Sequence, residues 1–162
     1  LLRNKIKNHP RYPYHLLREE MQEFILDKLQ LLIERKLIKG IGENGTEYTV
    51  IAQILDLPKE ILRLIQKFDF TKKNPKLIYI NTGETMISLQ DSILVTFLNL
   101  AGFDILFFVP TGYQSVENYF AEKLMEEHQI GEYKYDMQVP DLNNISTNST
   151  RPSWRRKLFR RG

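Results

Sequence analysis

The sequence predicts an α/β fold, with a three-layer βαβαβ parallel sheet of Rossmann-like type preceded by a helical segment. A short apolar strand at residues 76–80 is followed by Ser88 and Asp91, whose spacing is typical of a helix N-terminus. A nearly unbroken apolar strand follows at residues 104–109, as expected for a strand covered on both faces. Residues 133–139 then alternate between apolar and polar side chains, which predicts a half-exposed third strand.

The helical segment that precedes the sheet has its own periodic pattern. From Leu17 onward, apolar side chains recur every three or four residues, which predicts one long helix that Gly40 ends. Residues 46–55 fit either a strand or a helix, because β-branched and aromatic side chains give way to a helix-favouring run. Asp56 can cap a further helix with an apolar stripe, which extends to Phe68.

This pattern divides the chain into four parts. They are a connector at residues 1–15, the helical segment at 16–71, the βαβαβ domain at 72–142, and a polar linker with a basic tail at 143–162. In the third part we expect one helix at residues 89–101 and another at 115–131, each joining one strand to the next. Because the chain begins with Leu1 rather than methionine, we also expect further sequence upstream.

Composition limits the classes of protein that this chain can represent. Hydrophobic residues make up 42% and charged residues 27%, which is close to ordinary globular usage. The absence of cysteine excludes disulfides and thiolate chemistry. No apolar run reaches the length of a membrane-spanning helix, and no signal peptide is recognisable. The expected location is the cytoplasm.

Charge is unevenly distributed along the chain. The net charge is +3, and residues 151–162 carry six basic and no acidic side chains, which leaves −3 for residues 1–150. The folded body is therefore slightly acidic, and nucleic-acid binding is not expected. With Trp154, Leu158 and Phe159 among its cations, the tail fits weak contact with an anionic surface, although a solvated or self-packed terminus is slightly favoured.

The carboxyl edge of the predicted sheet holds the candidate ligand-binding residues, because ligands bind there in open parallel sheets. One turn contains Thr82, Gly83 and Glu84, and the other contains Thr111, Gly112, Tyr113, Gln114 and Ser115. A glycine, hydroxyls and a following helix N-terminus suit a phosphate or carboxylate group. Turn geometry and capping alone would also explain these residue types. Neither turn matches a nucleotide-binding motif, so the sequence identifies no cofactor.

Other polar residues give weaker signals. Glu117 could act as a general base or bind a ribose hydroxyl, but an acid in the first turn of a helix also complements the helix dipole. His128 has no partner at metal-ligand spacing, so no metal site is expected. No nucleophile elbow occurs, and catalytic residues stay unassigned.

Residues 31–50 allow a winged-helix interpretation. A helix, a short strand, the Asn44-Gly45 turn and a second strand would form the recognition helix and wing. The charges in this stretch are mixed rather than basic, and only one helix precedes it. DNA binding is therefore the least favoured function.

Several strings of residues resemble the YceG-like bacterial family. They lie at residues 57–71, 102–105, 110–113 and 128–133, together with Glu117 and Tyr119. The resemblance spans about residues 16–141 and corresponds to the C-terminal part of a longer protein. It implies a component of the biosynthetic module of Ter (tellurite-resistance) type stress operons, with other proteins of the operon as partners. It supplies no catalytic residues.

Two hypotheses for function follow. In the first, the chain is the C-terminal α/β domain of a stress-linked biosynthetic protein and binds a phosphorylated or nucleotide-like small molecule. In the second, it is a noncatalytic interaction module in which helices within residues 17–68 and the tail dock a partner protein or membrane. The sequence leaves open whether the chain is an enzyme.

Overall fold

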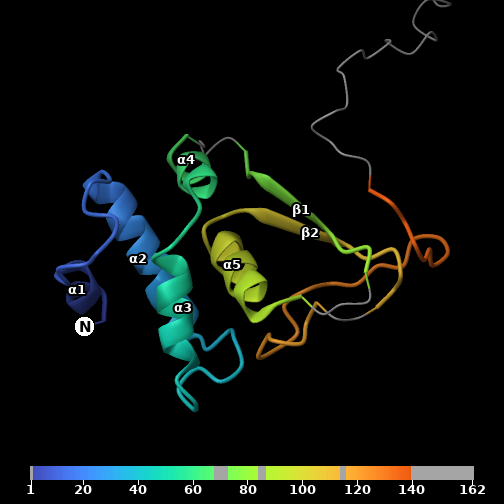
Figure 1. Ribbon diagram of the computed structural model, residues 1–162, viewed down its shortest axis with the longest axis horizontal. Coiled ribbons are helices and arrows are strands. Elements are labelled where there is room, and N and C mark those ends of the chain that lie inside the picture. The colour runs from blue at the N-terminus through green and yellow to red at the C-terminus, as the bar shows by residue number, and fades with distance from the viewer. Residues whose placement is uncertain (1, 68–72, 84–86, 114–115, 140–162) are drawn as a thin grey trace, which may run out of the picture.

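The computed structural model describes residues 2–67, 73–83, 87–113 and 116–139 (Figure 1). In chain order, the elements are α1 (Leu2–Lys7), α2 (Glu19–Glu34), α3 (Thr46–Ile54), α4 (Lys59–Lys67), β1 (Lys76–Ile80), α5 (Leu89–Leu100) and β2 (Asp104–Phe108). Mixed helix and strand content confirms the α/β class. No described helix combines the length and apolarity needed to cross a membrane.

The βαβ unit confirms one prediction from the sequence. β1 and β2 pair in parallel, with Lys76 opposite Asp104 and Ile80 opposite Phe108, and α5 joins the two strands. Ser88 caps α5 as expected, since its hydroxyl oxygen accepts a hydrogen bond from the Asp91 amide at 3.0 Å. The local capping signal was therefore sufficient to position this helix.

The described residues beyond β2 differ from the prediction. Residues 116–131 form turns, bends and irregular chain instead of the second crossover helix, and residues 133–139 form no strand. The reason lies in contacts distant in sequence: the Tyr119 carbonyl accepts the Lys39 amide and the Ala121 amide donates to Leu37, each at 2.9 Å. Backbone groups that a helix would use are thus paired with the segment after α2. The sheet has two strands among the described residues, not three.

The same contacts explain why α2 ends earlier than predicted. The helix ends at Glu34 rather than continuing to Gly40, because Ile38 forms an antiparallel bridge with Phe120. The ambiguous segment at 46–55 is helical as α3, and Gly45 precedes it with a φ angle of +81°. Val50 and Ile54 share the buried face of α3 at helical spacing.

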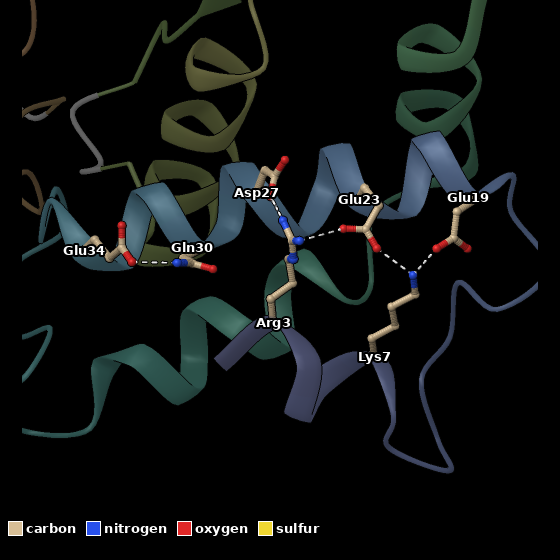
Figure 2. Close-up of polar contacts among 7 residues, drawn as sticks. All are labelled: Arg3, Lys7, Glu19, Glu23, Asp27, Gln30 and Glu34. Carbon is tan, nitrogen blue, oxygen red and sulfur yellow. Dashed lines mark hydrogen bonds and ion pairs between the residues drawn. The ribbon is translucent and has the colours of Figure 1, made fainter. Parts of the chain in front are cut away.

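Residues 1–15 contain structure that their weak periodicity did not indicate. Helix α1 lies along α2 and is held there by ion pairs, which Figure 2 shows. Lys7 pairs with both Glu19 and Glu23, with 2.5 Å between Nζ and the Glu23 carboxylate, and Arg3 lies between Glu23 and Asp27. The hydrogen bond from Lys7 holds the pKa of Glu23 below its ordinary value.

The elements stack in three layers, which Figure 1 shows: α2 with α3, then α5, then the sheet. Helix α5 is the centre of the molecule, and its buried residues Ile93, Phe97 and Leu98 contribute to the same core as Ile25 and the other buried side chains of α2. One face of the sheet packs toward this core through the partly buried Leu77, Tyr79, Ile105 and Phe107. The side chains of the opposite face are exposed.

Candidate functional site

The two turns predicted to bind a ligand lie at the same edge of the sheet. The Asn81 amide donates to the Phe108 carbonyl at 3.0 Å, so the chain leaves β1 and β2 side by side. Thr82 and Gly83 follow β1, and Thr111, Gly112 and Tyr113 follow β2. Glu84, Gln114 and Ser115, also predicted, lie outside the described residues. The structure therefore brings together the described part of the predicted site.

The first turn and the helix after it already satisfy several of their polar groups. The Gly83 amide donates to Asn81 Oδ1 at 3.3 Å. At the start of α5, the Ser88 hydroxyl both accepts from the Asp91 amide and donates to the Asp91 carboxylate at 2.7 Å. A carboxylate thus already lies at this helix N-terminus, where an anionic ligand was expected to gain from the dipole.

The second turn is closed by a tyrosine. Gly112 has a φ angle of +68°, and its amide donates to the Val109 carbonyl at 3.0 Å. The ring of Tyr133 lies so close that a Cβ added at Gly112 would be 2.1 Å from it. The Lys134 amide donates to the Pro110 carbonyl at 2.8 Å and holds this segment in place. The close approach that glycine permits is therefore made by Tyr133.

Three other predicted residues have clear positions. Thr111 is buried, whereas Tyr113 is half exposed and donates its amide to the Thr111 hydroxyl at 3.4 Å. Glu117 lies in a turn, where its carbonyl accepts the Phe120 amide at 3.2 Å, and not in the first turn of a helix. The interpretation of Glu117 as a dipole-complementing acid is therefore wrong.

The described residues contain no cluster of His, Asp and Glu that could hold a metal ion. His128 is exposed, and its Nε2 lies 3.7 Å from a carboxylate oxygen of the exposed Glu126. The winged-helix interpretation loses its second strand, because residues 46–54 form α3.

The outer face of the sheet is exposed among the described residues, so the expectation that residues 104–109 form a strand covered on both faces is wrong for this chain alone. Side chains of Ile78 and Ile80 from β1 and of Leu106 and Phe108 from β2 lie on it, with exposed fractions of 61, 38, 57 and 48%. The strand register places Ile78 beside Leu106 and Ile80 beside Phe108. We call these four residues the outer apolar face. Both strands are almost continuously apolar, and this sequence pattern is typical of strands that are covered on both faces.

One end of the outer apolar face is polar. Lys76 Nζ lies 2.6 Å from the Asp104 carboxylate, and the Asn74 side chain also donates to this carboxylate at 3.3 Å. The hydrogen bond from Lys76 holds the pKa of Asp104 below its ordinary value. The ion pair therefore marks the amino-terminal boundary of the face, and the apolar surface continues toward the carboxyl edge.

A groove of about 700 Å³ runs along β2. Its lining comes from four places: β2, α5, the segment from Phe120 to His128, and Arg35 and Leu37 in the segment after α2. Its volume lies within the range of small-molecule sites. Apolar side chains line the groove together with the polar Glu122, Glu126 and His128.

Comparisons with known proteins identify the family. A Bacillus subtilis (strain 168) protein named uncharacterized protein YceG is 31% identical over 93 residues, which are 56% of this chain and 17% of the relative. This chain therefore matches less than a fifth of the relative's length. No solved structure matches the chain. The family model described as the YceG domain matches residues 1–150, and the chain therefore belongs to the YceG domain family.

Proposed function

We propose that this chain is a noncatalytic interaction module of a YceG-family protein, and that the outer apolar face of its sheet is the docking surface. The observation that carries the proposal is a parallel sheet with one face packed on α5 and the other lined by Ile78, Ile80, Leu106 and Phe108. The occupant is an apolar helix from the part of a YceG-family protein that lies outside this sequence. We place this role in the cytoplasm, in a Ter-type stress operon whose other proteins are further candidate partners.

Parallel sheets are the physical basis for this choice of occupant. Because their crossover connections place helices on the faces, parallel sheets occur almost only where both faces are covered. Burying one large aliphatic side chain contributes about 1.5–3 kcal/mol. The Bacillus subtilis relative has most of its length outside the matched region, so a longer chain of this family can supply a covering helix.

Charge substitutions on the outer apolar face test the proposal. Ile78→Glu and Leu106→Glu, each made in this chain alone, should leave the melting temperature nearly unchanged, because both side chains are already more than half exposed. The same substitutions at the aligned positions of the full-length Bacillus subtilis relative should each lower the free energy of unfolding by about 2–3 kcal/mol.

Ile130→Glu is the matched control, since Ile130 is 90% exposed and lies outside the sheet. It should leave the stability of both proteins unchanged. If the two sheet substitutions are as harmless in the full-length relative as the control, nothing covers this face and the proposal is wrong.

A ligand-binding role is the second candidate, and one observation favours it: the two turns predicted from the sequence lie side by side at the carboxyl edge. The ligand class is a phosphorylated or nucleotide-like small molecule. A thermal-shift screen with nucleotides and sugar phosphates tests it, because a ligand at a hundred times its Kd stabilises a protein by about 2.7 kcal/mol. A shift that Tyr113→Ala abolishes would support this candidate, and no shift with any of these compounds would reject it.

A further inference from the structure

We infer that the sheet continues beyond β2: an extended strand from the part of a YceG-family protein outside this sequence pairs with the open edge of β2, in the groove beside it. The inference rests on the proposed function, because it specifies a second contact of the same module. It concerns a different surface, namely the strand edge and not the outer apolar face.

The direction of the backbone groups identifies the open edge. In a strand, the N–H and C=O of one residue point to the same side, and successive residues alternate. The Asp104 amide donates to the Pro75 carbonyl at 2.9 Å, and the Phe108 carbonyl accepts the Asn81 amide at 3.0 Å. Asp104, Leu106 and Phe108 therefore direct their backbone groups toward β1. Ile105 and Phe107 direct theirs away from β1.

The open edge coincides with the groove. Ile105 and Phe107 both line it together with α5 and residues 120–128, so the groove lies beside the two residues whose backbone groups point away from β1. Among the described residues, no backbone hydrogen bond to Ile105 or Phe107 from outside the sheet is present. A strand that pairs here would place alternate side chains against Val95 and Leu100 of α5, which also line the groove. Added strands gain affinity from backbone hydrogen bonds and specificity from such side-chain pockets.

The occupant follows from the architecture and from the family. The sheet has two strands among the described residues, so the far side of β2 is a sheet edge, and an exposed edge is a template for pairing with a further strand. Residues 133–139, which were predicted to supply the third strand, are instead held at the carboxyl edge through Lys134 and Pro110. The full-length Bacillus subtilis relative has ample chain outside the matched region to supply a strand of the five-residue length of β2.

Amide hydrogen exchange tests the inference, with neighbouring residues as the internal control. In this chain alone, the amides of Ile105 and Phe107 should exchange at least about tenfold faster than those of Leu106 and Phe108. In the full-length Bacillus subtilis relative, the amides at the positions aligned with Ile105 and Phe107 should be protected to the same degree as their neighbours, a slowing of about a hundredfold or more.

Two results would overturn the inference. Rapid exchange at the two aligned positions of the full-length relative would show that no strand pairs with this edge. Protection of Ile105 and Phe107 in this chain that increases with protein concentration would assign the edge to a second copy. The result is independent of the substitutions at Ile78 and Leu106, which report on a covering helix, so either proposal can fail without the other.

Discussion

Among single residues, Tyr14 links two distant parts of the chain. Its hydroxyl donates to the Ile54 carbonyl at 2.6 Å and accepts the Leu57 amide at 2.9 Å, and both bonds are buried. It therefore holds the segment after α1 against the connection between α3 and α4. Sequence alone did not predict this role, because residues 1–15 have no periodic pattern and the partners are about 40 residues away in sequence.

Removing the Tyr14 hydroxyl should destabilise the protein. Tyr14→Phe leaves a buried carbonyl and a buried amide without their partner, which costs about 1–3 kcal/mol. Tyr12→Phe is the matched control: Tyr12 is equally buried, its ring packs edge-on against Tyr14 at 5.9 Å, and its hydroxyl has no hydrogen-bond partner among the described residues. Urea unfolding at pH 7 should show a lower free energy of unfolding for Tyr14→Phe only. If both variants lose the same free energy of unfolding, the two hydrogen bonds of the Tyr14 hydroxyl do not stabilise the protein.

The same residue predicts a loss of stability at alkaline pH. Burial raises the pKa of Tyr14 to about 12, above its ordinary value of 10.0. Between these two pH values the unfolded chain loses the Tyr14 proton before the folded chain does, so the free energy of unfolding falls as pH rises. Below pH 10 the tyrosine is protonated in both states, so the contribution of Tyr14 to the free energy of unfolding is fully present. Urea unfolding of the wild type from pH 9 to pH 12 should show this decline, and Tyr14→Phe should show a smaller one.

At the scale of elements, local sequence patterns predicted the structure well, and the predictions failed where contacts distant in sequence determine it. The Ser88 cap and the apolar stripe after it were enough to locate α5, because both depend only on residues that are neighbours in the sequence. The expected helix at 115–131 failed because Lys39 donates its amide to the Tyr119 carbonyl, a partner that no local pattern contains. The apolar pattern of β1 and β2 indicates side chains suited to burial on both faces, but it cannot show which of these faces the chain itself covers.

The cap of α5 gives a prediction for one element. Ser88→Ala removes the side-chain acceptor of the Asp91 amide and should cost about 1 kcal/mol, the usual effect of losing an N-cap. Ser88→Asp retains an acceptor and should lose little, although it places a second carboxylate beside Asp91. Chemical denaturation of both variants measures the difference. If Ser88→Ala is as stable as the wild type, the cap does not determine where α5 begins.

At the scale of the whole molecule, the division at residues 71 and 72 stays a prediction. The core, however, is continuous across that position. Buried side chains of α2, α3 and α5 contact one another, and Phe120 from the last described segment joins the same cluster. Helix α5 packs on the helices before it as well as on β2. Helix α5 covers the inner face of the sheet, and the helical segment in turn covers the other side of α5.

This shared core predicts that the chain unfolds in one cooperative transition. Leu29 in α2 and Leu98 in α5 are almost completely buried, on opposite sides of the division, so each truncation to Ala should cost about 2–5 kcal/mol. Because the two residues belong to one cluster, each substitution should lower the midpoint of the same transition. Scanning calorimetry measures the midpoint and the enthalpy, and the calorimetric and van't Hoff enthalpies should agree. Two transitions, with Leu29→Ala shifting one and Leu98→Ala the other, would show instead that the helical segment and the βαβ unit fold separately.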